Sequence, residues 1–125
     1  VIIELARDEV ALWKPKSGSF CEDVIICDYQ LQQVDSILKE LGSAKLLKMR
    51  RLTTSNLEVS KSLGEAGAGF VILPTRVALG SSPTKLVKVP ASPVHEDRIC
   101  LVVRSERKRH PGMLQWIQAI KEAKL

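Results

Sequence analysis

Apolar residues fall along this chain in two alternating patterns. Short runs rich in Val, Ile and Leu, such as 23–28 and 70–73, are typical of strands buried in a sheet. Longer stretches, such as 30–41, carry apolar residues every three or four positions, which is typical of helices that pack one face on a sheet. Together the patterns predict strands at 1–3, 9–13, 23–28, 45–52, 70–73, 86–89 and 99–103, and helices at 30–41, 57–66 and 113–125.

Residues at the ends of the predicted helices support these boundaries. Gly42 follows the first helix and is a natural C-terminal stop. Ser55 and Glu58 have the Ser-x-x-Glu spacing of a capping box, which predicts that the second helix starts at Ser55. Stretches that contain Gly, Pro and Ser are expected to be loops, and they lie at 14–19, 77–84 and 90–97.

This order of elements predicts an α/β fold with a mixed, largely parallel sheet flanked by helices. In open sheets of this kind ligands bind beyond the carboxyl ends of the strands, beside the starts of helices. Three segments therefore form the candidate binding site. They are Cys27, Asp28, Tyr29 and Gln30 after one strand, Thr53, Thr54 and Ser55 after the next, and Pro74, Thr75 and Arg76 after a third.

The residue types in these segments suit a small polar ligand. Thr53, Thr54 and Ser55 lie where the free N–H groups of a helix start attract carboxylates and phosphates. Arg76 is suited to a bidentate contact with a carboxylate. The alternative is structural: Ser55 caps the helix, the threonines suit a strand end, and Arg76 is a surface charge.

No catalytic, metal or cofactor site is expected. The chain has neither a phosphate-binding Gly-x-x-x-x-Gly-Lys motif nor a Gly-x-Ser-x-Gly nucleophile motif. The Gly-rich run at 64–69 ends a helix and enters a strand, the reverse of the order that a dinucleotide site needs. Cys21, Cys27 and Cys100 do not have the spacing of zinc ligands, and Cys27 and Cys100 lie in apolar runs that predict buried thiols.

Composition and charge narrow the remaining classes. The chain is 45% hydrophobic and 26% charged and has no unbroken apolar run long enough to cross a membrane. Its net charge of +5 suggests an acidic partner. The densest basic run, 104–110, lacks the interleaved aromatic residues of a nucleic-acid surface, so we expect a solvated loop before the last helix.

Residues 57–74, with the Glu-Ala-Gly-Ala-Gly turn followed by Phe-Val-Ile-Leu-Pro, resemble the effector domains of LysR-type transcriptional regulators. The order and spacing of three later segments, at 86–90, 99–104 and 116–120, are also similar to that family. Upstream, 8–15 looks like a strand that crosses between the two lobes of such a domain.

The resemblance implies a bacterial, cytoplasmic regulator with a two-lobed fold like that of type II periplasmic binding proteins. It assigns 16–93 to the second lobe and 1–15 and 94–125 to the first, so that the chain is a piece without the helix-turn-helix and most of the first lobe. It also implies an anionic or zwitterionic effector, carboxylate or amino-acid-like, in an interlobe cleft, self-association, and DNA binding through the missing helix-turn-helix. Asp28 at the cleft favours an effector with an amino group.

Two other readings stay open at this point. The chain is alternatively a lobe of a solute-binding protein of a transporter, although three unpaired cysteines argue against an exported protein. An enzyme on a similar two-lobed fold is the remaining alternative, and it would need acid–base or cofactor-anchoring residues that the sequence does not present.

Overall fold

The structure is a computed structural model that describes residues 1–80 and 84–123. Its residues form two compact units. The central unit is Glu9–Asp97, and the terminal unit combines Val1–Asp8 with Arg98–Leu125. Two strands, β1 (Ile2–Pro15) and β6 (Val94–Val102), contribute residues to both units and pair with each other.

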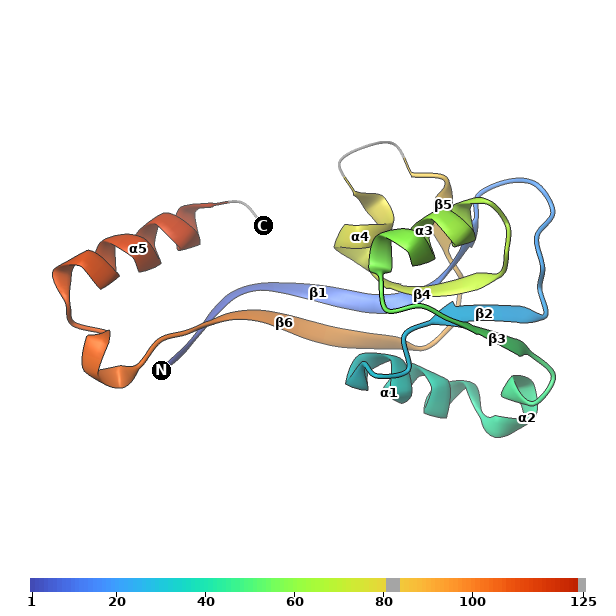
Figure 1. Ribbon diagram of the computed structural model, residues 1–125, viewed down its shortest axis with the longest axis horizontal. Coiled ribbons are helices and arrows are strands. Elements are labelled where there is room, and N and C mark those ends of the chain that lie inside the picture. Colours follow the sequence, from blue (N-terminus) through green and yellow to red (C-terminus); the bar gives the residue numbers. More distant parts are fainter. Residues whose placement is uncertain (81–83, 124–125) are drawn as a thin grey trace. The chain divides into compact units, whose positions relative to one another are not determined.

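The central unit alternates strands and helices along most of its length (Figure 1). Its further elements are β2 (Val24–Cys27), α1 (Gln32–Leu41), α2 (Ser43–Leu46), β3 (Arg50–Thr53), α3 (Leu57–Glu65), β4 (Phe70–Pro74), α4 (Thr75–Leu79) and β5 (Leu86–Lys88). The terminal unit adds the single 3-10 turn Ser105–Arg107 and the helix α5 (Pro111–Glu122).

The sheet is mixed, which confirms the predicted α/β class. Its strand order is β3-β2-β4-β1-β5, and β6 pairs with β1 outside this path. Strand β2 runs parallel to both β3 and β4. Strand β1 is antiparallel to β4 and β5. The parallel part therefore consists of the three strands that the candidate binding segments follow.

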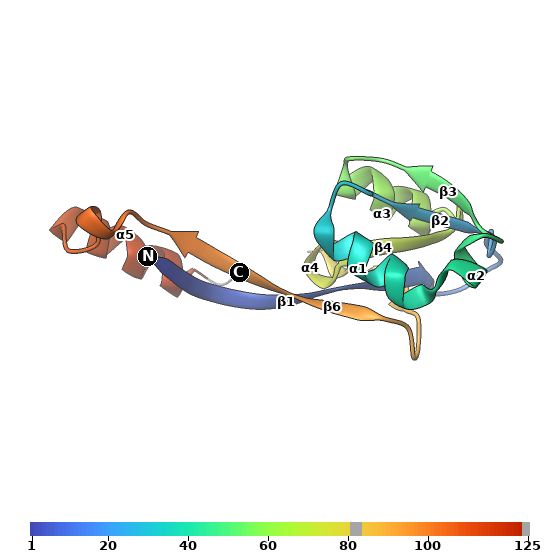
Figure 2. The same cartoon turned by 90° about the horizontal axis from the view of Figure 1, so that it is seen from below.

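Helices cover both faces of this sheet, and each face has its own core cluster. Ile25 and Cys27 point to the face of α1 and α2, where they pack with Val34, Ile37 and Leu46. Their neighbours along β2 point to the opposite face, against α3 and α4 (Figure 2). All four residues of β2 are buried, so the prediction of a strand buried on both faces is confirmed.

Two predicted strand assignments near the sheet are wrong. Residues 1–3 and 9–13 belong to one strand, β1, which continues through the charged residues between them; Glu4 and Arg7 are exposed there and form an ion pair. The expected strand at 45–52 is a helical turn followed by β3. The turn places Leu46 in the core beside α1, and tertiary packing thus overrides the loose alternation of this segment.

The loop predictions need similar corrections. Residues 75–79 form α4, which buries Ala78, whereas a loop was expected from 77, and 81–83 lie outside the described residues. Strand β6 begins at Val94, within the expected loop 90–97. Helix α5 begins at Pro111, two residues earlier than predicted, with His110 as its N-cap, and 124–125 lie outside the described residues. The predicted Gly42 stop and the exposed run 104–110 are confirmed.

The start of α3 differs from the predicted capping box by one residue. Asn56, not Ser55, is the N-cap, and its Oδ1 accepts hydrogen bonds from the N–H groups of Glu58 and Val59 at 2.9 and 3.2 Å. An Asn56→Ala variant should therefore lose about 1 kcal/mol of unfolding free energy in urea denaturation. Ser55→Ala, at an exposed position, should change it by less than about 0.5 kcal/mol. Equal losses would contradict this assignment.

Candidate functional site

The three candidate segments meet at one edge of the central sheet. Cys27 and Thr53 are register partners in the parallel pair β2–β3, and the Thr54 N–H donates to the Cys27 carbonyl at 3.4 Å. Strand β4, parallel to β2, ends at Pro74. Figure 1 shows that α1, α3 and α4 all start at this side of the central unit. The expected convergence of the strand ends is thus present, and we call it the strand-end edge.

In the first segment, Cys27–Gln30, some side chains are buried in the core and others lie at the strand-end edge. The Cys27 side chain has no exposed surface, and the Tyr29 hydroxyl is also buried. Asp28 is half-buried, and its Oδ1 accepts from the Gln30 N–H at 3.0 Å, which folds the segment into a tight turn. Only Asp28 and Gln30 therefore present polar side chains at the edge.

Cys27 and Tyr29 form a buried neighbouring pair. Burial raises the pKa of the Cys27 thiol, while the Tyr29 hydroxyl and Arg51 partly oppose this effect. Burial and the contact with Cys27 raise the pKa of Tyr29 as well. Within the described residues the Tyr29 hydroxyl has no partner in good hydrogen-bond geometry, so its contact with the thiol is weak. Since a protonated, buried thiol is a poor nucleophile, Cys27 is placed for packing rather than chemistry.

The second segment is the most accessible of the three. Thr53 and Ser55 are exposed, and Thr54 is half-buried. The Thr54 hydroxyl oxygen accepts from the Asn56 N–H at 3.2 Å. Because Asn56 caps α3, two of the N–H groups at that helix start are already bonded within the protein. Helix α1 differs: no side chain among the described residues caps its first turn, so this start is the better place for a ligand anion.

The third segment begins α4. Pro74 is its N-cap residue, and the Thr75 hydroxyl donates to the Glu9 carbonyl at 3.0 Å. This bond ties α4 to β1 at the edge. Arg76 is exposed on the first turn. The Glu9 carboxylate pairs with Lys88 at 2.8 Å, so a cationic side chain of β5 also lies near β1 here.

The structure adds polar groups that sequence reasoning did not single out. Gln33 on α1 donates to the Asp97 carboxylate at 3.3 Å, which joins the first turn of α1 to β6. Arg51 lies over the Tyr29 ring at 5.4 Å, beside an open cavity of about 490 Å³ that both residues line. The sequence carries no signal for these contacts, because each joins residues far apart or on different elements.

Two findings on the described residues concern metal binding and membrane spans. In residues 1–80 and 84–123 no three His, Cys, Asp or Glu side chains gather in a way that would hold a metal ion. No helix there is both long and apolar enough to cross a membrane. The polar side chains at the strand-end edge carry hydroxyl, amide and carboxylate groups.

Comparison with known proteins identifies the family. The model of the LysR substrate binding domain matches residues 25–124, which is most of the chain. The chain belongs to the LysR substrate-binding domain family. This match confirms the resemblance seen in the order of the sequence motifs. A search of curated proteins found no match.

Solved structures of the same family share the fold at low sequence identity. The regulatory domain of a HypT mutant from Salmonella typhimurium is 14% identical with a TM-score of 0.64, over 94% of this chain and 67% of that one. The reduced OxyR regulatory domain from Pseudomonas aeruginosa is 15% identical with a TM-score of 0.59, over 98% and 64%. CbnR, a LysR family transcriptional regulator, is 16% identical with a TM-score of 0.57, over 97% and 46%. This chain thus spans about two thirds of those two regulatory domains and under half of CbnR.

Proposed function

We propose that this LysR substrate-binding domain senses a small metabolite and thereby controls transcription in a complete regulator. The observation that supports this most is the strand-end edge, where parallel strands place Asp28, Gln30, Thr53 and Thr54 side by side before two helix starts. Such an edge is the usual ligand site of an open α/β sheet. The membership of the chain in the LysR substrate-binding domain family makes effector sensing a better explanation of this edge than catalysis.

The ligand that fits this edge carries both charges of an amino acid. The uncapped start of α1 suits a carboxylate, because its N–H groups and the helix dipole favour negative charge. The half-buried Asp28 carboxylate, four residues earlier in the chain than Gln32, attracts an ammonium group. We therefore propose an amino-acid-like effector, with hydroxyl groups of Thr53 and Thr54 as further hydrogen-bond partners.

In this proposal, the steps that connect effector binding to transcription involve other parts of the complete regulator. In the proposed regulator a helix-turn-helix binds DNA in the cytoplasm, and the effector changes how copies of the protein associate. An effector shifts such an equilibrium only by its difference in affinity for the two states. The assignment of 16–93 to a second lobe, and closure of a first lobe over it, stay predictions.

A ligand titration of the labelled chain tests the proposed site. The twenty amino acids and their carboxylate analogues without the amino group are added to the 125-residue chain, and backbone amide shifts are followed by NMR. We expect one amino acid to shift the amides of residues 28–33 and 53–56 more than its analogue does. In the Thr53→Val, Thr54→Val double variant, loss of two hydrogen bonds should weaken binding about tenfold.

Ser62→Ala is the matched control, because it removes an exposed hydroxyl on α3 away from the strand ends. Its affinity for the same amino acid should equal that of the unchanged chain. The proposal is rejected when no compound shifts the edge amides at concentrations up to about 10 mM, at which even a binding free energy of about 2.7 kcal/mol would be detected. It is also rejected when the double variant binds as tightly as the control.

A further inference from the structure

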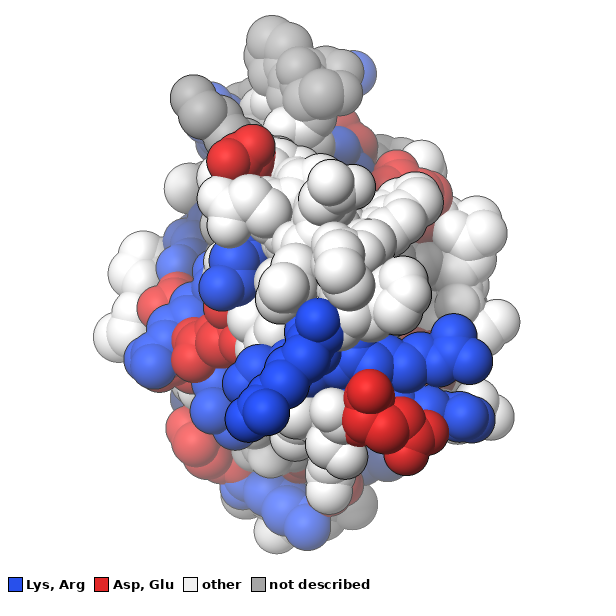
Figure 3. Space-filling view, turned by 90° about the vertical axis from the view of Figure 1, so that its left-hand side faces the viewer, with Lys and Arg blue, Asp and Glu red and all other residues white. Residues whose placement is uncertain are grey.

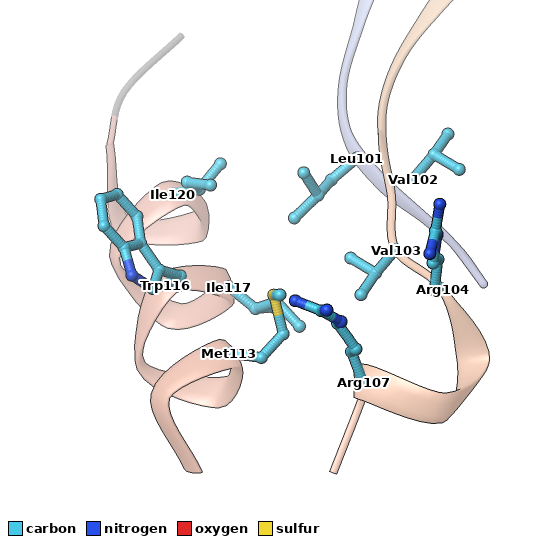
Figure 4. Close-up of a pocket in the computed structure, with 9 residues that line it drawn as sticks. All are labelled: Leu101, Val102, Val103, Arg104, Arg107, Met113, Trp116, Ile117 and Ile120. Atoms are coloured by element: carbon cyan, nitrogen blue, oxygen red, sulfur yellow. The ribbon is translucent and has the colours of Figure 1, made fainter. Parts of the chain in front are cut away.

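The terminal unit has exposed apolar side chains, of which Trp116 is the largest. Figure 3 shows an uncharged area bordered by a belt of Lys and Arg side chains. Figure 4 shows a hollow between β6 and α5, which Met113, Ile117 and Arg107 help to line. This unit joins both ends of a chain that spans about two thirds of the related regulatory domains, so its exposure is no evidence of a ligand site. A smaller pocket lies within the central unit, which is one unbroken stretch of chain.

The smaller pocket lies at the starts of the parallel strands, opposite the strand-end edge, and we call it the strand-start pocket. Ile25 near the start of β2, Phe70 at the start of β4, Leu41 at the end of α1 and the turn at 89–93 line it. Figure 1 shows that α1 ends on the side of the central unit where β2 begins. The pocket has a volume of about 230 Å³. An apolar cavity of about 150 Å³ is already large enough to bind benzene.

Apolar side chains form most of the lining of the strand-start pocket. Leu12 and Ile25 are buried side chains of the sheet, and Met49 and Phe70 are half-buried. The Met49 thioether and the Phe70 ring favour an aromatic ligand, because sulfur–ring and ring–ring contacts add to the burial of apolar surface. The pocket therefore suits a small compound that contains an aromatic ring.

The polar groups of the lining favour an uncharged ligand. Among the described residues that line the pocket, only Ser92 and Lys45 carry a hydroxyl or a charged group. The Ser92 hydroxyl already donates to the Val89 carbonyl at 2.6 Å. Lys45 is exposed on α2, and an ion pair at an exposed ammonium group strengthens binding by less than about fivefold. The lining thus offers little to replace the water around a ligand carboxylate.

One wall of the pocket is a turn with an uncommon backbone conformation. Ala91 has a φ angle of +56°, which residues with a side chain rarely adopt. Such conformations persist where the surrounding structure holds them, and they cluster at ligand sites. Pro90 and Pro93, with their fixed φ angles, and the Ser92–Val89 hydrogen bond hold this turn. The wall is therefore preformed, and little conformational entropy is lost when a ligand binds.

We propose that the strand-start pocket binds a small uncharged aromatic compound of about the size of toluene. The volume admits one such ring. A stable protein interface buries roughly 800 Å² on each partner, so a pocket for a single ring would be only a small part of one. The lining shares no residue with the segments 27–30, 53–55 and 74–76, and this second site is thus separate from the proposed effector site.

Toluene is the probe for this site, and benzoate is its charged counterpart. The chain has two methionines, of which Met49 lines the strand-start pocket and Met113 lines the hollow of the terminal unit. Their methyl signals in the 125-residue chain are followed by NMR during both titrations. We expect toluene to shift the Met49 signal saturably and to bind at least about tenfold more tightly than benzoate, whose carboxylate loses hydration without a strong partner.

Two substitutions that fill the pocket test its location. Val89→Phe places a ring in the lining and should weaken toluene binding at least about tenfold, because the ligand can no longer bury its own ring there. Leu41→Trp fills the pocket from α1 and supplies the same test where urea denaturation shows that Val89→Phe does not fold. Val87→Phe is the matched control, because it adds the same ring at an exposed position of β5 outside the lining. It should keep toluene affinity within about twofold, as should the Thr53→Val, Thr54→Val variant.

Unchanged toluene affinity in the folded filled variants would overturn the proposal. Benzoate that binds as tightly as toluene would also overturn it, and would point to an anion site at Lys45. A Met49 signal that changes with protein concentration in the absence of toluene would assign the pocket to a side chain of a second copy. Saturable shifts confined to Met113, or no saturable shift at all, would remove toluene from the strand-start pocket.

Discussion

Replacement of Trp13 by alanine should lower the free energy of unfolding by about 3–5 kcal/mol, the largest effect that we expect from a single substitution. Trp13 is 3% exposed in β1 and packs in the core cluster with Val71 and Leu73. Its indole N–H donates to the Leu73 carbonyl at 3.0 Å. This bond joins β1 to the neighbouring strand β4, two residues along from Val71, the register partner of Trp13. The variant leaves a cavity and also removes this hydrogen bond.

Urea denaturation followed by circular dichroism measures this loss. Trp116→Ala is the matched control, because that indole is 69% exposed on α5, and it should change the unfolding free energy by less than about 0.5 kcal/mol. Similar losses for the two tryptophans would show that the β1 core contributes less to stability than its burial indicates.

Gly69→Ala should destabilise the chain by about 2–3 kcal/mol, for a different reason. A Cβ atom at Gly69 would lie 2.6 Å from the carbonyl oxygen of Val24 and 2.8 Å from its Cβ. The obstacle is the backbone of β2, so relief of the clash requires β2 and β4 to move apart in the middle of the sheet. Because the nearest atoms are the carbonyl oxygen and the Cβ of Val24, a change of side-chain rotamer cannot relieve the clash.

Gly112→Ala tests whether the clash is responsible. An added Cβ there meets only the ring of His110, at 3.3 Å, and Gly112 lies in the first turn of α5. Alanine suits a helix better than glycine, so this variant should be within about 0.5 kcal/mol of the unchanged chain in the same urea denaturation. A loss as large as that of Gly69→Ala would mean that side-chain addition at any glycine destabilises the fold.

The elements with strong patterns could be predicted from the sequence. The β-branched run that forms β2 and the 3.6-residue period of α1 have the same meaning in isolation and in the fold, since each buries the side chains that its period marks. The segment 45–52 has no such pattern. Whether this segment forms a helix or a strand depends on the packing of Leu46 in the core beside α1, which is a contact between elements.

The candidate site shows the same division. That Asp28 and Thr53 lie at one edge follows from parallel strands, and it could be deduced without coordinates. Which side chains face the ligand side could not. Cys27 is the last residue of β2 and alternation turns it into the core, while Tyr29 folds back beside it. Asn56 and Ser55 are equally good caps by residue type, and only the backbone geometry selects Asn56.

The central unit is one unbroken stretch of chain, Glu9–Asp97, whereas the terminal unit is assembled from both ends. This difference has a consequence for the order of folding during synthesis. Every residue of the central unit has been translated before Arg98 is added, so that its two core clusters can form while α5 is still absent. Val1–Asp8 can complete their unit only after Arg98–Leu125 have emerged, so their apolar side chains wait for their partners while the central unit already has all of its residues.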